Sequence, residues 1–371
     1  MKRVLRVLVV GVAVLAVSGV PGVAGATAGV GPDRGGLQRE LDSVAGATAV
    51  GALAEVRDGK GVWRGTSGVA VRGTSRPVPV DGLFRVGSIT KTFVATVVLQ
   101  LVAEGRVRLE DSVERWLPGV VPNGRNITLR QLLNHTSGLY DYVKAVPKPP
   151  SPEFFADRWR TRTASEQIQQ ALAHPPTSQH PGKEYAYSNT GYLLLGEVIQ
   201  KVTGRTYGQE IERRVIRPLR LRGTVMPGTS PWIPGPHPHG YVPTDLNLTG
   251  YVDYTELNPT LFGAGGDMIS TTHDLNRFFG ALLGGRLLPK YLLKQMETAG
   301  TPTHDYGLGL SWKDTTCGIR VYGNDGDALA YNAWSFSSAD GRHQVSIAVT
   351  PTFRVDPDDA VDAFVDKAVC G

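Results

Sequence analysis

The segment Phe84-Arg85-Val86-Gly87-Ser88-Ile89-Thr90-Lys91-Thr92-Phe93 places a serine and a lysine three residues apart, directly before an apolar helical pattern. That pattern has apolar residues at spacings of three and four, which predicts an α-helix, at Phe93, Val94, Val97, Val98, Leu101 and Val102. Ser88 is therefore expected at or just inside the start of this helix. Lys91 follows one turn later on the same helical face, so the hydroxyl and the amine can meet.

A hydroxyl beside an amine can serve as a nucleophile beside its base, provided that the amine is neutral. Burial favours the neutral amine, because desolvation disfavours the ammonium form. The spacing alone is not specific, since Ser-x-x-Lys is expected by chance about once in a chain of this size. The alternative is a serine that caps the helix and a lysine that faces solvent.

The composition is that of a soluble globular protein. The chain has 371 residues, of which 41% are hydrophobic and 20% charged. This length is sufficient for one large domain or for two lobes around a substantial core. The chain contains no internal repeat that would indicate a solenoid.

The N-terminus is predicted to be a secretory signal peptide over residues 1–26. Lys2, Arg3 and Arg6 precede an apolar run over residues 7–17, and small residues suited to cleavage follow it. The alternative is a membrane anchor, but the apolar run is short for a span. We therefore expect a secreted, extracellular protein without a stable membrane anchor.

The net charge of +5 includes the three basic residues of the predicted signal peptide, which contains no acidic residue. The remaining chain is only slightly basic, and this argues against a nucleic-acid partner. The chain has two cysteines, Cys317 and Cys370. An even pair in an exported protein suggests a disulfide, and the alternative is two free buried thiols.

Both ends of the chain show strand patterns. A hairpin is predicted over residues 52–65, with its turn at Asp58-Gly59-Lys60-Gly61, and residues 69–72 are a further short extended piece. Near the C-terminus, strands are predicted over residues 318–322, 333–337 and 344–350, followed by an amphipathic helix over residues 358–369.

The middle of the chain is mostly helix and loop. Helices are predicted over residues 127–133 with Thr128 as N-cap, over 165–173, and over 189–199 with Gly204 as the stop. The two terminal strand regions then form one antiparallel sheet, and the helices form an inserted lobe. The predicted fold class is therefore α+β.

A second motif, Tyr187-Ser188-Asn189, stands at the start of the apolar helix over residues 189–199. A phenol can relay protons, and an amide can both donate to and accept from a substrate. The alternative is a packed tyrosine with Asn189 as a helix cap. Tyr322-Gly323-Asn324 has the same spacing but lies on a predicted strand, so we do not assign it as the relay.

In combination, these motifs resemble the penicillin-recognising serine enzymes, specifically the branch of secreted D-alanyl-D-alanine carboxypeptidases (DD-peptidases) and class C β-lactamases. The similarity runs from about Gly51 to the C-terminus. It is carried, in order along the chain, by residues 85–91, 132–139, 185–192, 265–275 and 306–310. The cysteine pair also resembles that of secreted actinomycete DD-peptidases.

The resemblance implies a single β-lactamase-like module over residues 27–371. Its α/β lobe is expected over about 27–90 and 285–371, and its helical lobe over about 91–284. It also implies roles for individual residues. Ser88 is the acylated nucleophile, and Lys91 deprotonates it directly or through Tyr187. Tyr187 shuttles a proton to the leaving group.

The resemblance further implies that Asn189 holds the amide of the acyl side chain. The oxyanion hole is expected from the backbone N–H groups of Ser88 and Asp327. No metal or other cofactor is implied. The expected partner is a small-molecule or peptide substrate of a monomeric enzyme.

The sequence departs from the family at the third motif, which is normally Lys-Thr-Gly or His-Thr-Gly. The aligned residues are Asn324, Asp325, Gly326 and Asp327. Related carboxypeptidases also have an arginine just after Gly-Leu-Gly-Leu that helps to bind the substrate's carboxylate. Here that stretch continues as Ser311-Trp312-Lys313.

These changes replace cationic and hydroxyl groups with an amide and two carboxyl groups. A substrate carboxylate close to another carboxylate at a partly buried site costs on the order of a few kcal/mol. We therefore hypothesise a hydrolase that keeps the acylation machinery but binds an ester, an amide or a cationic group in place of the free carboxylate. The alternative is that Asp325 and Asp327 point to solvent and Lys313 restores the charge.

Two other functions stay open from the sequence. One is an acyltransferase that passes an ester-derived acyl group to an amine, as in natural-product biosynthesis. The other is a non-catalytic, penicillin-binding sensor on the same fold. Ser88, Lys91, Tyr187 and Asn189 argue against the sensor, whereas Asn324 argues for it.

Overall fold

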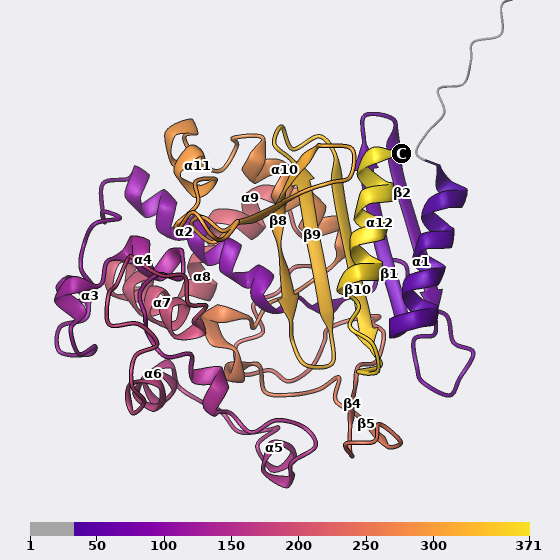
Figure 1. Cartoon of the computed structure of the whole chain (residues 1–371), viewed down its shortest axis with the longest axis horizontal. Helices are drawn as coiled ribbons and strands as arrows, with labels where there is room; N and C mark the ends of the chain where they lie inside the picture. The colour runs from indigo at the N-terminus through magenta and orange to yellow at the C-terminus, as the bar shows by residue number, and fades with distance from the viewer. Residues whose placement is uncertain (1–32) are drawn as a thin grey trace, which may run out of the picture. The chain divides into compact units, whose positions relative to one another are not determined.

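The computed structural model describes residues 33–371, so the predicted signal peptide lies outside the described residues. Six strands form one antiparallel sheet in the order β2-β1-β10-β9-β8-β7 (Figure 1). The strands are β1 (Ala49–Asp58), β2 (Gly61–Gly68), β7 (Ser311–Asp314), β8 (Arg320–Asp327), β9 (Asn332–Ser338) and β10 (Gln344–Pro351). The pairing of β1 with β10 joins the two ends of the chain, which confirms the predicted sheet and the α+β class.

Helices cover both faces of the sheet. Helix α1 (Arg34–Thr48) and helix α12 (Asp358–Cys370) lie beside each other on one face (Figure 1), where Leu41 and Phe364 are fully buried. Helix α10 (Thr272–Leu283) packs against the other face, in contact with β9 and β10. The predicted division at residues 284/285 assigns α10 to the helical lobe, although it contacts the sheet.

The remaining elements build the layer next to α10. The helices are α2 (Thr90–Ala103), α3 (Val113–Trp116), α4 (Leu129–Leu133), α5 (Pro152–Ala156), α6 (Ala164–Leu172), α7 (Asn189–Thr203), α8 (Tyr207–Ile211), α9 (Arg217–Leu219) and α11 (Lys290–Met296). Two small sheets pair β3 (Phe84–Arg85) with β6 (Ile269–Ser270), and β4 (Tyr241–Pro243) with β5 (Tyr251–Asp253).

Two helix boundaries lie at the capping residues that the sequence predicted. Thr128 caps α4 in a capping box with Gln131, in which each side chain accepts a hydrogen bond from the backbone N–H of the other residue. Helix α7 ends at Gly204, which adopts a left-handed conformation with φ of 74°. Both boundaries follow from residue types within one helical turn, which explains why the sequence alone predicted them.

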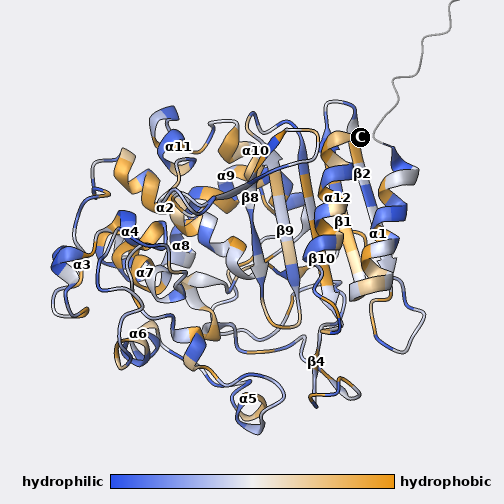
Figure 2. Cartoon of the chain, in the orientation of Figure 1, coloured by the Kyte–Doolittle hydropathy of each residue, from blue (hydrophilic) through white to orange (hydrophobic). Residues whose placement is uncertain are grey.

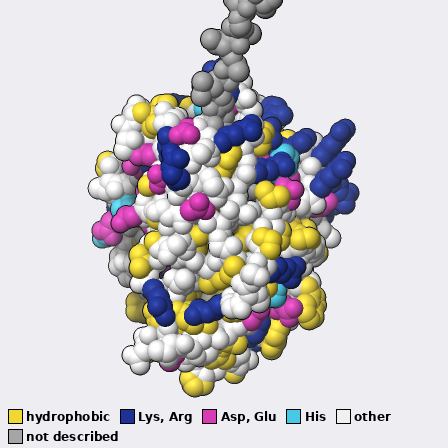
Figure 3. Space-filling view, turned by 90° about the vertical axis from the view of Figure 1, so that its right-hand side faces the viewer, with side chains coloured by type: hydrophobic (Ala, Val, Ile, Leu, Met, Phe, Trp, Pro, Cys, Tyr) yellow, Lys and Arg dark blue, Asp and Glu magenta, His cyan; other side chains and the backbone are white. Residues whose placement is uncertain are grey.

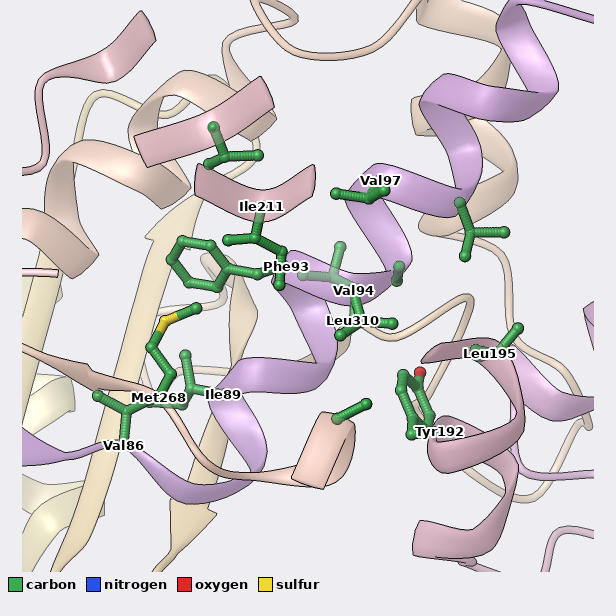
Figure 4. Packing of buried hydrophobic residues seen from close by; sticks show 14 of the residues in the cluster. Val86, Ile89, Phe93, Val94, Val97, Tyr192, Leu195, Ile211, Met268 and Leu310 are labelled. Atoms are coloured by element: carbon green, nitrogen blue, oxygen red, sulfur yellow. The ribbon is translucent and has the colours of Figure 1, made fainter. Parts of the chain in front are cut away.

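Helix α2 forms the centre of the larger hydrophobic core. Its residues are buried almost throughout, and it is hydrophobic along much of its length (Figure 2). Phe93 stacks on Phe278 of α10 with ring centroids 3.6 Å apart, and Val94 and Val97 lie among other core side chains (Figure 4). Burial of each such side chain contributes about 1.5–3 kcal/mol. The helix that carries Lys91, directly after the turn with Ser88, is therefore packed on nearly every face.

Three details of the strands differ from the sequence prediction. Strand β7 was not predicted, because four residues at a sheet edge carry little periodic signal. Strand β8 extends beyond the predicted Tyr322 to Asp327, since its pairing with β9 continues through the glycines. Residues 69–72 form only an isolated bridge, between Val69 and Pro77.

Cys317 and Cys370 form a disulfide, as the sequence predicted, with their Cα atoms 5.9 Å apart. The bond joins the segment between β7 and β8 to the last residue of α12, across a sequence separation of 53 residues. It therefore ties the C-terminal helix to the edge of the sheet.

The double variant Cys317→Ala/Cys370→Ala is expected to lower the free energy of unfolding by about 2–4 kcal/mol, because the unfolded chain regains the freedom that the closed loop removed. Denaturant unfolding measures the change, with reduced wild-type protein as the matched control. An unchanged midpoint in both samples contradicts this expectation.

Basic and acidic side chains are interspersed among uncharged ones on the face shown in Figure 3. Among residues 33–371, the structure contains no helix of the length and hydrophobicity needed to cross a membrane.

Candidate active site

Ser88 lies in a short 3-10 turn, Gly87–Ile89, which leads directly into α2. The sequence placed Ser88 at this helix start, and the structure agrees. Gly87 has φ of 52°, a conformation that favours glycine. The turn leaves the Ser88 side chain partly exposed, whereas Lys91 one turn later is fully buried. The hydroxyl is therefore accessible to a substrate while the amine is screened from water.

The Lys91 amine has three close neighbours. Its Nζ lies 2.9 Å from Ser88 Oγ, 2.7 Å from Asn189 Oδ1 and 2.7 Å from the backbone oxygen of Gly265. The last two atoms can only accept hydrogen bonds, so they engage the two N–H bonds of a neutral amine. The remaining lone pair then faces Ser88 Oγ, in the position required to accept the hydroxyl proton.

Burial lowers the pKa of Lys91 to about 7, while the charges of Asp141 and Asp325 oppose the shift. An ordinary lysine is almost entirely protonated at neutral pH. At this site, a substantial fraction of the amine is neutral and can act as a base.

Tyr187 completes the contacts of the nucleophile, with its hydroxyl 2.6 Å from Ser88 Oγ. Burial raises the pKa of Tyr187 well above its usual value, so the phenol keeps its proton. Its ring also lies 4.9 Å from Lys91 Nζ. The arrangement can therefore supply a base and a proton donor to the same oxygen.

Asn189 is held between Lys91 and a carboxylate. Its Oδ1 accepts from Lys91, and its Nδ2 lies 3.1 Å from both carboxylate oxygens of Asp141. Asp141 also accepts from the backbone N–H of Asn189 at 3.1 Å. The amide predicted to bind substrate lines the cleft, but its oxygen and nitrogen have protein partners that orient it toward Lys91.

The Ser88 turn and strand β8 are in close backbone contact at the position where the oxyanion site is expected. A Cβ at Gly326 would lie 2.7 Å from the backbone N of Ser88, and a Cβ at Gly87 would lie 2.7 Å from the backbone N of Asp327. Such distances exclude any side chain at either glycine. The two backbone segments therefore approach closely enough for N–H groups of both to serve one oxygen atom.

These residues open into a cleft of about 680 Å³. One part of its wall is apolar and aromatic, formed by Val143, Val146, Pro147, Phe154, Leu261 and Phe262. The lining also contains Asn324, Asp325 and Asp327 from strand β8. The cleft lining thus combines apolar and aromatic side chains with two carboxyl groups and Ser88.

The third-motif residues point in different directions. Asn324 is buried, and its Nδ2 lies 3.3 Å from Thr92 Oγ1 of α2. Asp325 and Asp327 are exposed at the cleft, where burial by the surrounding walls nevertheless raises the pKa of both. The Asp327 side chain also accepts from the backbone N–H of Leu329 at 2.7 Å.

The two lysines near this acidic edge differ in position. Lys313 forms an ion pair with Asp362 of α12 and lies 4.5 Å from the Phe336 ring centroid. It is not among the residues that line the cleft, so the alternative in which Lys313 replaces the missing cation in the cleft is not supported. Lys148, which the sequence analysis did not select, lines the cleft from the loop before α5.

Sequence reasoning also missed the residues that support Lys91 and Tyr187. Gly265 lies within a segment that carried the family resemblance, but nothing local indicates its hydrogen bond to Lys91. Asp141 has no motif of its own. His135 places its ring 4.2 Å from the Tyr187 ring and accepts at Nδ1 from the backbone N–H of Ser188. A left-handed conformation at His135, with φ of 57°, aims this ring.

Within residues 33–371, no group of three or more histidine, cysteine, aspartate or glutamate side chains is placed to hold a metal ion.

Comparison with known proteins gives concordant matches. The sequence model of the Beta-lactamase family matches residues 38–369. A penicillin-binding protein of Bacillus subtilis is 30% identical over 79% of this chain and 66% of its own length. An esterase of Burkholderia gladioli is 35% identical over 47% of this chain and 46% of its own length.

Solved structures extend the comparison. A D-stereospecific amidohydrolase from a Streptomyces species is 41% identical, with a TM-score of 0.83, and the match covers 90% of this chain and 98% of that one. A D-amino acid amidase from Ochrobactrum anthropi, solved with L-phenylalanine amide, is 27% identical, with a TM-score of 0.78. That match covers 90% of this chain and 97% of the amidase chain. In contrast, the chain spans only 66% and 46% of the two curated relatives above.

Proposed function

Because the chain belongs to the β-lactamase family of penicillin-recognising serine enzymes, we propose that it is a serine hydrolase that cleaves amides or esters through an acyl-Ser88 intermediate. The observation that carries this proposal is the contact of Ser88 Oγ with Lys91 Nζ at 2.9 Å and with the Tyr187 hydroxyl at 2.6 Å. The preferred substrates have a leaving group without a free carboxylate.

Acylation begins when Ser88 Oγ attacks the carbonyl carbon and its proton passes to the neutral amine of Lys91. The carbonyl oxygen gains negative charge and is stabilised by the backbone N–H groups of Ser88 and Asp327. When the bond to the leaving group breaks, Tyr187 protonates the departing atom. The Lys91 ammonium then returns a proton to Tyr187, so both groups are restored.

Deacylation uses the same groups in reverse. Water takes the place of the leaving group, Tyr187 and Lys91 accept its proton, and the proton finally returns to Ser88 Oγ as the acid product departs. Direct proton transfer from Ser88 to Lys91 is supported by the lowered pKa of Lys91, whereas the raised pKa of Tyr187 suits a donor.

The proposed substrate class follows from the residues that line the cleft. The apolar wall around Phe154 and Phe262 suits a hydrophobic side chain on the acyl group. Asp325 and Asp327 border the nucleophile where the family usually binds a carboxylate, and they disfavour an anionic leaving group. The amidohydrolase and the amidase among the similar structures are named for D-stereospecific amide cleavage. Their names support a substrate in which an amide bond joins a D-configured acyl group to the leaving group.

The deciding experiment compares an acyl-D-Ala-D-Ala peptide as free acid with its methyl ester and its carboxamide. We expect the uncharged forms to have the higher kcat/KM, with product identified by mass spectrometry. A wild-type enzyme that prefers the free acid overturns the proposed substrate class. A lack of acyl-Ser88 and of turnover with all three forms, and with D-phenylalanine amide, overturns the hydrolase itself.

The double variant Asp325→Asn/Asp327→Asn is expected to raise kcat/KM for the free acid at least tenfold relative to the methyl ester. Removing like charge near the carboxylate is worth about 1–2 kcal/mol at such a site. Asp362→Asn is the matched control, because this carboxylate pairs with Lys313 away from the cleft lining. If the double variant leaves the ratio unchanged, the acidic edge does not set the preference.

Lys148 offers the competing explanation, since it lines the cleft and its charge acts on Asp327. If the free acid is the better substrate and Lys148→Met removes that preference, Lys148 has rebuilt the carboxylate site.

Acyl transfer to an amine is a second candidate, and the acidic edge of the cleft favours it. Asp325 and Asp327 attract a cationic acceptor to the side from which the acyl group is released. Addition of a primary amine to the ester reaction tests this function. An amide product that exceeds the hydrolysis product supports transfer, whereas product limited to the acid supports hydrolysis.

Export is part of the proposal. The signal peptide predicted over residues 1–26 supports it, and so does the disulfide, since disulfides persist mainly in oxidising compartments. Recovery of the protein from the medium with a new N-terminus near residue 27 is the expected result, and retention of an intact N-terminus inside the cell contradicts it.

A further inference from the structure

Asp141 is a buried carboxyl group that takes no part in the proton transfers proposed for Ser88. It lies directly before the 3-10 turn Tyr142–Ala145 and is 48 residues from Asn189 in the sequence. Its Oδ1 accepts hydrogen bonds from the backbone N–H of Asn189 at 3.1 Å and from that of Val143 at 3.3 Å. Both carboxyl oxygens also lie 3.1 Å from Asn189 Nδ2. Asp141 therefore contacts Asn189 through its backbone and its side chain together.

The segment that carries Asp141 is fixed to the start of α7 by three further hydrogen bonds. The backbone oxygen of Tyr140 accepts from Thr190 Oγ1 at 2.7 Å and from Ser188 Oγ at 3.3 Å. The backbone N–H of Tyr142 donates to Thr190 Oγ1 at 3.1 Å. The carboxyl group is thus held in one position relative to the first turn of this helix.

This carboxyl group determines which end of the Asn189 amide faces Lys91. A carboxylate has only acceptors, whereas an amide has an acceptor oxygen and a donor nitrogen. The donor Nδ2 of Asn189 therefore faces Asp141, and its Oδ1 faces Lys91 Nζ at 2.7 Å. In the reversed orientation, the amide oxygen would face the carboxylate, and Nδ2 would donate to the lone pair of the neutral amine. That lone pair would then not be free to accept the proton of Ser88.

We propose that Asp141 is a positioning residue, which holds the amide of Asn189 so that the lone pair of Lys91 faces Ser88. The inference rests on the function proposed for Ser88 and extends it to a residue that does not line the cleft. Two simpler roles compete with it. Asp141 caps the 3-10 turn that follows it, and its negative charge raises the pKa of Lys91. Neither of these roles requires the amide of Asn189.

The test measures acylation of Ser88 by p-nitrophenyl acetate, followed by mass spectrometry of the quenched reaction. This probe needs neither a protonated leaving group nor the preferred substrate class. Rates are compared at a pH well above the pKa of Lys91, which is about 7, so that loss of a nearby negative charge does not change the protonation of the amine. Asp141→Asn should lower the rate of acylation by about 10–100-fold, because the amide loses its fixed orientation.

The same replacement in an Asn189→Ala background separates the roles, since this background has no amide to orient. There, Asp141→Asn should change the acylation rate by less than about twofold. An equal loss in both backgrounds overturns the proposal, because a cap or a charge acts without the amide. Asp111→Asn is the matched control, since Asp111 is also buried but bonds to Arg115 and Trp116 and does not line the cleft. It should leave the acylation rate unchanged.

A second readout needs no substrate. The side-chain amide of Asn189 is identified in ¹H–¹⁵N NMR spectra by its absence from Asn189→Ala. Its protons should lose the downfield shift of a carboxylate hydrogen bond in Asp141→Asn and keep it in Asp111→Asn. Unchanged amide signals in Asp141→Asn overturn the positioning role. A wild-type enzyme that is not acylated overturns the proposed hydrolase instead, and the NMR comparison then decides separately whether Asp141 orients the amide.

Discussion

Replacing Lys91 with methionine is expected to lower kcat/KM for amide and ester substrates by about 10³–10⁴-fold, because it removes the base that accepts the Ser88 proton. Methionine has a similar length and no charge, so it fills the same fully buried position. The thermal midpoint should therefore not fall by more than a few degrees. Mass spectrometry of the quenched reaction should show almost no acyl-Ser88.

The matched control is Lys148→Met, which removes an exposed lysine from the lining of the same cleft. It should retain acylation with an ester substrate, since the side-chain hydrogen bonds of Ser88 in the described structure go to Tyr187 and Lys91. Equal losses in the two variants would mean that the positive charge of the cleft matters, and not the base at Lys91.

The pH dependence of the wild-type enzyme tests the same assignment. Lys91 acts as a base only when neutral, and burial lowers its pKa to about 7. The rate of acylation should therefore rise as pH increases through about 7 and then level off. Because the pKa of Tyr187 is raised well above its usual value, ionisation of the phenol should not reduce the rate at moderately alkaline pH. A rate that keeps rising towards the pKa of an ordinary lysine contradicts a neutral Lys91.

Replacing Tyr187 with phenylalanine is expected to lower kcat/KM for an amide substrate by about 10²–10³-fold, because the leaving amine no longer receives a proton. The loss should be much smaller for a p-nitrophenyl ester of the same acyl group, since p-nitrophenolate leaves without protonation. The measurement is kcat/KM for the matched amide and ester in wild type and variant.

Tyr185→Phe is the control for this prediction. Tyr185 lines the cleft and stacks on His304 with ring centroids 4.0 Å apart, but it makes no hydrogen bond to Ser88. Its removal should affect amide and ester equally. If Tyr187→Phe also reduces both substrates by the same factor, Tyr187 orients Ser88 but does not protonate the leaving group.

Much of the fold could be predicted from the sequence, because its signals are local. The apolar spacing after Ser88 predicts helix α2, Thr128 and Gly204 mark helix boundaries, and alternating residues near both ends predict the central strands. The pairing of Ser88 with Lys91 also follows from a spacing of three residues. The approach of Tyr187 to Ser88 came from family resemblance, since nothing local joins residues 99 positions apart.

The parts that could not be predicted depend on contacts between remote segments. Strand β7 forms by pairing with the edge strand β8. Lys313 forms its ion pair with Asp362, which lies 49 residues later in the chain, and it does not line the cleft. The sequence could suggest either direction for Asp325 and Asp327. Packing around β8 places both carboxyl groups at the cleft and buries Asn324 against α2.

The sequence alone predicted the candidate nucleophile and base, because a serine and a lysine one helical turn apart need only a local helix to meet. The tertiary structure decided whether the amine can act as a base. Its pKa depends on burial, and its lone pair is aimed by Asn189 and Gly265, which lie 98 and 174 residues away. Desolvation and hydrogen-bond direction arise only when distant segments pack together, so no reading of the sequence near Lys91 contains them.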